Sequence, residues 1–227
     1  MYANLIFDLD ETLFDFKKGE QLSLEQLFTN HGLTNLDELV AAFRQLNHQV
    51  WLAIQAGGDR DALMNTRFAK LLAEFGEVVD GPAMQREYHQ YLNDQAFVFD
   101  GALDLLATLR AHHGLIVAGT NGSTAVQTKR LAKAGLTPYF DAVYTSETIG
   151  VNKPDGQFFQ YIMQQHPEMT PENTVMIGDG LLPDIHGAQQ AGLPTIWVNL
   201  YDQPNNTAYQ SDYTVTSYAA LAKLLIN

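Results

Sequence analysis

Residues 7–13 of this chain read Phe7-Asp8-Leu9-Asp10-Glu11-Thr12-Leu13, directly after the short apolar run that begins at Asn4. This run has the length and composition of a buried β-strand bounded by polar residues. Three acids within four residues then stand where the strand ends. Carboxylates that close together repel one another unless positive charge lies among them. Mg²⁺ prefers hard oxygen ligands, so the stretch favours a magnesium site at the end of a strand.

The composition limits the classes of protein to consider. The chain has 227 residues, of which 46% are hydrophobic, enough for one domain or for one domain with an insertion. It has no cysteine, which excludes disulfides, thiol catalysis and cysteine-ligated metals. The net charge of −13 argues against a nucleic acid polymer as partner, because phosphate backbones are bound largely by Lys and Arg. A small phosphorylated metabolite remains compatible with this charge.

The sequence favours a cytoplasmic protein that does not enter a membrane. No basic, apolar signal segment opens the chain, and the first residues lead straight into a strand. No apolar run approaches the ~20 residues that a membrane span needs. Monomer and homodimer both remain open as oligomeric states.

Two kinds of pattern follow the first strand. Residues 20–93 show helical periodicity and predict a bundle of about four helices, with Thr34 and Asp37 as a capping box and a further helix start at Asp80. After Phe97, helices alternate with short apolar runs, and Asp100 is the expected N-cap of the first of these helices. The predicted strands are Leu115 to Gly119, Ala142 to Thr145, Thr174 to Gly178, Pro194 to Val198 and a weaker Asp212 to Thr216.

Alternating strands and helices predict an α/β fold, a Rossmann-like parallel sheet with helices on both faces. The first strand belongs to this sheet, so the helical segment is an insertion. We therefore expect a discontinuous α/β domain of residues 1–15 and 96–227, and an inserted four-helix-type domain of residues 16–95.

Polar residues cluster where the predicted strands end, and ligands of such sheets bind beyond the carboxyl ends of the strands. Each cluster alone has an ordinary explanation, as a turn, a helix cap or a surface lysine. Lys153, however, precedes a predicted helix start, where the helix dipole disfavours a cation unless an anion is bound. Signals at several ends of one sheet together favour a phosphate site. The residues are Asp8, Asp10, Thr120-Asn121-Gly122-Ser123, Lys153, Asp179 and Asp184.

The combination resembles the haloacid dehalogenase superfamily of hydrolases. Its four motifs match Phe7 to Leu13, Thr120-Asn121-Gly122, Lys153-Pro154 and Gly178 to Asp184, in order and across the whole chain. The helical insertion stands where that superfamily places its C1 cap domain. The resemblance implies phosphoryl transfer, because the dehalogenases lack the second aspartate, here Asp10, and the metal, and cleavage of a phosphate ester needs both.

The resemblance also implies a role for each motif residue. Asp8 would be the nucleophile that forms an aspartyl-phosphate, and Asp10 would be the general acid and base. Lys153 would pair with the nucleophile and the phosphate, and Thr120, Asn121 and Gly122 would bind phosphoryl oxygens. Mg²⁺ would be held by Asp8, the Asp10 carbonyl, Asp179 and Asp184. None of the seven histidines receives a catalytic role.

The choice of substrate is expected to depend on the cap. The chain is similar to the bacterial pyrimidine-type 5′-nucleotidases, which implies a nucleoside 5′-monophosphate as substrate. The stretches that carry this resemblance are Phe14-Asp15-Phe16, Val50-Trp51-Leu52, Arg67-Phe68 and Gly119 to Gly122. Aromatic side chains stack on bases, and Phe14, Phe16 and Trp51 are candidates for this contact. Phosphoglycolate phosphatases and phosphosugar mutases of the β-phosphoglucomutase type share the core and a similar cap, so both stay open. A 2-haloacid dehalogenase and a non-catalytic phosphate-binding protein are the remaining alternatives.

Overall fold

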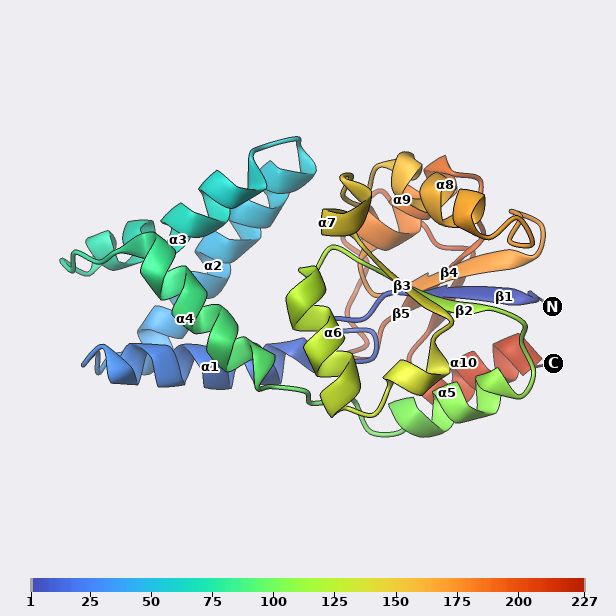
Figure 1. Ribbon diagram of the computed structural model, residues 1–227, viewed down its shortest axis with the longest axis horizontal. Helices are drawn as coiled ribbons and strands as arrows, with labels where there is room; N and C mark the ends of the chain where they lie inside the picture. Colours follow the sequence, from blue (N-terminus) through green and yellow to red (C-terminus); the bar gives the residue numbers. More distant parts are fainter. Residues whose placement is uncertain (1, 227) are drawn as a thin grey trace. The chain divides into compact units, whose positions relative to one another are not determined.

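In the computed structural model, which describes residues 2–226, six parallel strands form one sheet in the order β3-β2-β1-β4-β5-β6 (Figure 1). Three of the predicted strands have the expected bounds, and the other three differ by one residue at one or both ends. The strands are β1 (Asn4–Phe7), β2 (Ile116–Thr120), β3 (Ala142–Thr145), β4 (Thr174–Gly178), β5 (Thr195–Val198) and β6 (Tyr213–Val215). The predicted parallel α/β sheet is confirmed.

The strand order brings the motif segments to one edge of the sheet. β1 lies between β2 and β4, with Phe7 opposite Ala118 on one side and Ile177 on the other. The three strands therefore end close to the same level, and each continues into one of the polar segments noted above. The strand order reverses at β1, which is where open α/β sheets bind their ligands.

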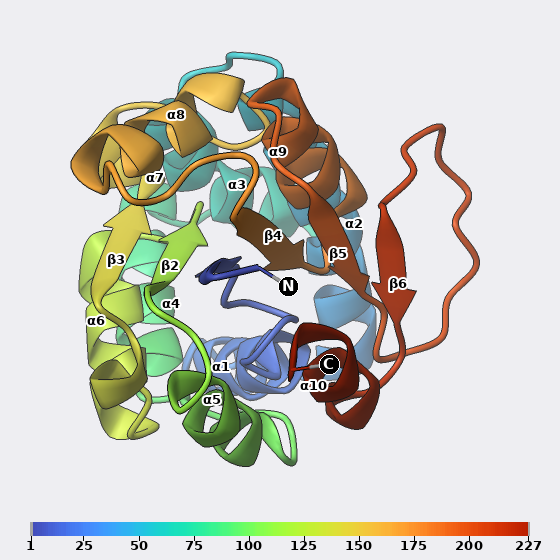
Figure 2. The same cartoon turned by 90° about the vertical axis from the view of Figure 1, so that its right-hand side faces the viewer.

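Both faces of the sheet are covered by helices, as the continuous apolar strands require. Helices α5 (Ala102–Arg110) and α10 (Tyr218–Ile226) lie on one face, and α8 (Gly156–Gln165) and α9 (Gly187–Gln190) lie on the other (Figure 2). Side chains of β1 alternate between the two cores: Leu5 and Phe7 belong to the first, and Ile6 to the second. β1 is thus buried on both faces, which holds the residues that follow it in place.

The remaining elements of the sheet unit connect the strands. Helix α6 (Thr124–Lys133) follows β2, and the short helix α7 (Ser146–Ile149) follows β3. A 3₁₀ turn spans Thr137–Tyr139, and a π-helical turn spans Leu181–His186 directly after β4. The π-helical turn brings Asp184, the second carboxylate of the fourth motif, back towards the end of β4.

The chain divides into two compact units, and one of them, Lys17–Gln95, consists of helices and their connecting turns. They are α1 (Phe16–Asn30), α2 (Leu36–Gln55), α3 (Arg60–Glu74) and α4 (Gly81–Asn93). Their core includes Phe43 stacked on Phe68 at 5.1 Å between ring centroids. The other unit contains the sheet and consists of the chain up to Phe16 and from Ala96 onward.

Two of the predicted helix caps are wrong. The N-cap of α5 is Gly101, with φ of 87°, and not Asp100, because the chain enters this helix through a left-handed residue that favours glycine. Helix α2 begins after Asn35 without a side-chain cap, so Thr34 and Asp37 form no capping box. The predicted start at Asp80 is confirmed, since its carboxylate accepts a hydrogen bond from the Ala83 N–H. None of the helices in residues 2–226 is long and apolar enough to cross a bilayer.

Candidate active site

Lys153 lies at the centre of the site and joins two of the four motif aspartates, Asp8 and Asp184. Its Nζ donates to Asp8 Oδ1 at 2.7 Å, to Asp184 Oδ1 at 2.6 Å and to the Gly119 carbonyl at 2.8 Å. The side chain of Lys153 is only 2% exposed. Burial alone would lower the pKa of this amine, but Asp184 and Asp8 more than offset it and raise the pKa. Lys153 is therefore a fixed ammonium group between two carboxylates.

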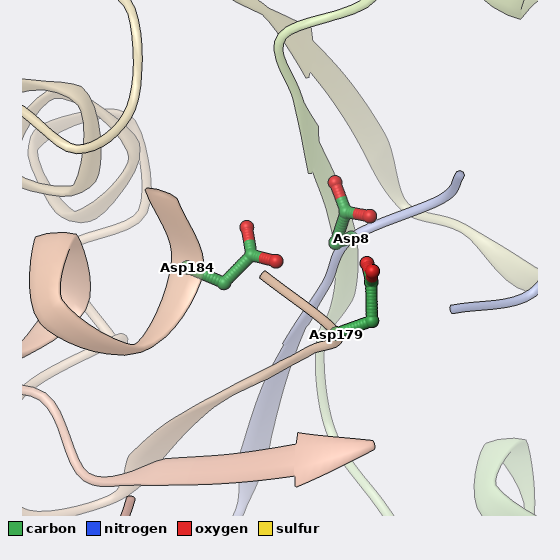
Figure 3. A group of neighbouring side chains, drawn as sticks. All are labelled: Asp8, Asp179 and Asp184. Carbon is green, nitrogen blue, oxygen red and sulfur yellow. The ribbon is translucent and has the colours of Figure 1, made fainter. Parts of the chain in front are cut away.

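Asp8, Asp179 and Asp184 converge from the end of β1, the end of β4 and the π-helical turn (Figure 3). One carboxylate oxygen of each lies within 4.8 Å of the others. Burial, together with repulsion from Asp184 and Asp10, raises the pKa of Asp8 to about 7 despite the opposing effect of Lys153. Burial and the charges of Asp8 and Asp184 likewise raise the pKa of Asp179. One lysine does not balance three acids, of which Asp8 and Asp184 are buried and Asp179 is partly buried. An all-oxygen donor set with excess negative charge fits a divalent cation such as Mg²⁺.

Two glycines make room for Asp184. A Cβ on Gly178 would overlap the Asp184 carboxylate, and a Cβ on Gly180 would overlap Pro183. Without those side chains the carboxylate turns back to the strand end and accepts a hydrogen bond from the Gly180 N–H at 2.8 Å. The lack of space for a side chain thus explains why both of these positions in the fourth motif are glycine.

Thr12 links the first and fourth motifs. Its hydroxyl lies 3.4 Å from Asp8 Oδ2 and 3.3 Å from Asp179 Oδ1, and it accepts a hydrogen bond from the Asp179 N–H at 3.0 Å. The Thr12 carbonyl in turn accepts from the Tyr218 hydroxyl at 2.7 Å, and the Asp179 carbonyl accepts from Trp197 Nε1 at 2.8 Å. The backbone next to these carboxylates is therefore hydrogen-bonded to side chains of α10 and β5.

The segment after β2 supports Lys153 and presents a hydroxyl. Asn121 accepts from the Lys153 N–H and donates to the Lys153 carbonyl, each at 2.9 Å. Its side chain is therefore occupied in holding the lysine backbone. Thr120 Oγ1 accepts a hydrogen bond from the Gly122 N–H at 2.9 Å. The hydroxyl hydrogen of Thr120 is left to donate to a ligand.

Asp10 stands apart from the Asp8, Asp179 and Asp184 cluster and is held from helix α6. Its Oδ1 accepts from Arg130 Nη1 at 2.5 Å, and its Oδ2 accepts from Gln127 Nε2 at 2.6 Å. The Asp10 side chain is 27% exposed, whereas that of Arg130 is 2% exposed. The second acid of the first motif thus remains open to solvent while its partners are buried.

The three predicted aromatic contacts lie in different surroundings. Phe14 is fully buried in the core, so its ring has no surface to offer a substrate, and the predicted contact is not supported in this structure. Phe16 is partly exposed, with the Arg130 guanidinium 5.4 Å from its ring centroid. Trp51 belongs to the helical unit, is partly exposed and has the Arg60 guanidinium 5.5 Å from its ring centroid.

The sequence interpretation missed Thr12, Gln127 and Arg130. Thr12 lies inside the first motif, and only its contacts with Asp8 and Asp179 reveal its role. Gln127 and Arg130 are three residues apart on one helix, which places them on the same face. Two long polar side chains on the face that also carries the buried Val126 and Leu131 are the signal that could have identified them.

The chain resembles known proteins over nearly its full length. The haloacid dehalogenase-like hydrolase family matches residues 2–192. The pyrimidine 5′-nucleotidase PynA of Streptococcus pneumoniae is 39% identical over 99% of this chain and 95% of its own length. The pyrimidine 5′-nucleotidase YjjG of Escherichia coli is 29% identical over 97% and 96%.

A crystal structure of the HAD-hydrolase YfnB from Bacillus subtilis, bound to magnesium, has the same fold. It superimposes with a TM-score of 0.93 at 35% identity and covers 99% of this chain and 98% of its own. The family match, the relatives and the arrangement of the four motifs agree. This chain belongs to the haloacid dehalogenase-like hydrolase family.

Proposed function

We propose that this hydrolase is a Mg²⁺-dependent phosphatase that cleaves small phosphate monoesters, with nucleoside 5′-monophosphates as its preferred class. One observation carries the proposal. The carboxylates of Asp8, Asp179 and Asp184 lie within 4.8 Å of one another, and a single buried lysine binds two of them, Asp8 and Asp184. The solvent-accessible carboxylate of Asp10 follows two residues after Asp8. A nucleophile, a cation site and a separate proton donor are the parts that phosphoryl transfer from an alkyl ester needs.

The metal fits the residues present. The carboxylates of Asp8, Asp179 and Asp184 and the backbone carbonyl of Asp10 would hold Mg²⁺. When bound, the ion would neutralise charge on the phosphoryl oxygens and on the surrounding acids. The raised pKa values of Asp8 and Asp179 support this, because they reflect burial of the two carboxylates and, after it, repulsion from neighbouring acids that Lys153 does not offset.

The first chemical step forms a covalent intermediate on Asp8. The Asp8 carboxylate attacks phosphorus, the bond from phosphorus to the leaving oxygen breaks, and Asp10 gives its proton to that oxygen. Lys153 donates to Asp8 Oδ1 and so orients the attacking group. The Thr120 hydroxyl, whose oxygen already accepts from Gly122, donates its hydrogen to a phosphoryl oxygen. Splitting the displacement in this way replaces one difficult step by two easier ones.

The second step returns the enzyme to its starting state. Water attacks phosphorus, gives its proton to Asp10, and the bond between phosphorus and the Asp8 oxygen breaks to release inorganic phosphate. Asp10 ends protonated, ready for the next leaving group. This exchange requires Asp10 to reach solvent, which agrees with its partial exposure.

Asp10 also separates phosphatase chemistry from dehalogenation. Halide leaves as an anion and needs no proton, whereas an alkoxide from a nucleoside 5′-oxygen is a poor leaving group without one. A dehalogenase therefore has no use for a second aspartate with two dedicated hydrogen-bond donors. The arrangement favours phosphate esters over haloacids.

The relatives favour nucleotides among phosphate esters, since two of them are named pyrimidine 5′-nucleotidases. The helical unit Lys17–Gln95, which contains none of the motif residues, would act as the cap and set this preference. The test is a panel of nucleoside 5′-monophosphates, phosphoglycolate and β-glucose 1-phosphate, each with Mg²⁺ and with excess chelator. Free phosphate from nucleotides, lost in chelator, is the expected result. Isomerised sugar phosphate would indicate a mutase, and cleavage of 2-haloacids in chelator would overturn the proposal.

A further inference from the structure

Helix α6 directs two hydrogen-bond donors at the carboxylate of Asp10. Gln127 donates to Oδ2 at 2.6 Å and Arg130 donates to Oδ1 at 2.5 Å. Each carboxylate oxygen therefore receives one donor, and the two donors lie almost one helical turn apart on the same face. Two such contacts fix both side-chain torsions of an aspartate, which one contact alone does not.

In the ion pair between Arg130 and Asp10, the arginine is the more tightly held side chain. It is buried, and its guanidinium lies 4.2 Å from the Phe14 ring centroid and 5.4 Å from that of Phe16. Stacking on aromatic rings holds the planar guanidinium in one orientation. Asp10 is by contrast 27% exposed. The geometry of the pair is therefore set by the arginine, and the carboxylate follows it.

Gln127 couples Asp10 to the segment after β2. Besides Asp10, its Nε2 lies 3.4 Å from Thr120 Oγ1, and its Oε1 lies 3.3 Å from Arg130 Nη1. A Cβ on Gly122 would overlap the Gln127 side chain, so the glycine of the second motif makes room for this residue. The amide is itself buried and thus has one defined position. The same side chain touches the residue proposed to move protons and the residue proposed to hold the phosphoryl group.

We infer that Arg130 and Gln127 are positioning residues that hold the Asp10 carboxylate where it exchanges a proton with the leaving oxygen and the attacking water. This inference rests on the phosphatase proposal, since it assigns the two side chains to the proton-transfer step of that reaction. Proton transfer needs heavy atoms within hydrogen-bond reach, and a misplacement of about 1 Å can cost about 100-fold in rate.

A purely structural role explains the arrangement less well. Burying an arginine costs desolvation energy, which one ion pair often fails to offset, so such a pair is a weak source of stability. Here the buried cation is matched to a carboxylate that stays open to solvent. The ion pair therefore affects the position of the Asp10 carboxylate more than the stability of the core.

The test compares two leaving groups. Arg130→Met keeps the side-chain bulk against Phe14 and removes the donors, and Gln127→Met does the same for the amide. For a nucleoside 5′-monophosphate, kcat/KM, which reports the steps up to formation of the phospho-enzyme, should fall about 10- to 100-fold, whereas kcat/KM for an activated aryl phosphate, whose leaving group needs no proton, should fall less than about 3-fold. In an Asp10→Asn background, neither substitution should lower the nucleotide rate further.

Arg110→Met is the matched control, because it breaks a bidentate ion pair with Asp141 in the same unit, away from the motif residues. It should leave both rates unchanged. Equal losses of kcat/KM on both substrates, or a full further loss in the Asp10→Asn background, would show that Arg130 and Gln127 only support the fold. If Arg130→Met does not fold, the same comparison with Gln127→Met decides the question. A wild-type enzyme without activity on any phosphate ester would instead reject the proposed function, and this inference with it.

Discussion

Lys153 donates from Nζ to Asp8 Oδ1 at 2.7 Å, although 145 positions separate the two residues in the sequence. The parallel sheet creates this contact, because β1 and β2 end side by side and Asn121, just after β2, holds the backbone of Lys153. The same amine reaches Asp184 at 2.6 Å. Lys153 is thus the buried cation that lets Asp8 and Asp184 lie close together.

Lys153→Met should abolish most activity and weaken the metal-free protein. The substitution removes the ammonium group that orients Asp8 and leaves buried acids without compensation. We expect kcat/KM for a nucleotide to fall about 100- to 1,000-fold, as when a preorganised donor to developing charge is removed. The melting temperature in chelator should fall as well, and Mg²⁺ should restore part of it. Lys223→Met, at an exposed position of α10, is the control and should change neither quantity.

The metal-free protein should become less stable as the pH rises through the weakly acidic range. Asp8 has an ordinary pKa of 3.8 when unfolded and about 7 when folded, mainly because of burial, so between these values the folded state binds more protons. Stability therefore falls with rising pH in this interval, and the raised pKa of Asp179 acts in the same direction.

Thermal unfolding in chelator at several pH values between 4 and 8 measures this effect, with 3.8 and about 7 as the limits set by Asp8. The decline should be smaller in Asp8→Asn, which has no proton to lose at this position, and smaller in wild-type protein with Mg²⁺. A wild-type profile identical to that of Asp8→Asn would mean that Asp8 ionises normally in the folded protein.

Phe14→Ala should act on stability more than on substrate choice. The ring is fully buried beneath the Arg130 guanidinium, so its removal leaves a cavity and frees the arginine. Loss of a buried phenylalanine costs about 3–5 kcal/mol of unfolding free energy. Denaturant unfolding measures this loss. A stable variant with a raised KM for nucleotides alone would show that Phe14 contacts the substrate after all.

Much of the sheet was predictable because its strands are buried on both faces. Such strands are continuous apolar runs, and β1, β3 and β4 have the predicted bounds. Residues Asp8, Lys153, Asp179 and Asp184 were predictable as a group, since each follows a strand and parallel strands end at one edge. The order of the strands was not predictable from local pattern, because it depends on contacts between distant segments.

The hydrogen-bond donors to Asp10 could not be recognised from the sequence for a related reason. Gln127 and Arg130 are ordinary helix residues by pattern, and only the packing of α6 in the fold gives them their direction. The cap at Gly101 was missed because Asp100 has the stronger capping preference, while the left-handed backbone at Gly101 is a tertiary feature. Phe14 was assigned to the substrate because an aromatic residue near a motif has the same pattern whether it binds a ligand or fills the core.

The central claim is that Asp8 is the nucleophile of a Mg²⁺-dependent phosphatase. The most direct test is release of inorganic phosphate from a nucleoside 5′-monophosphate by wild-type protein and by Asp8→Asn, purified side by side and assayed with Mg²⁺. Wild-type protein should release phosphate, and the variant, which keeps the shape but loses the nucleophile, should be slower by about 1,000-fold or more while remaining folded. A folded Asp8→Asn variant that releases phosphate at a rate close to wild type would contradict the account.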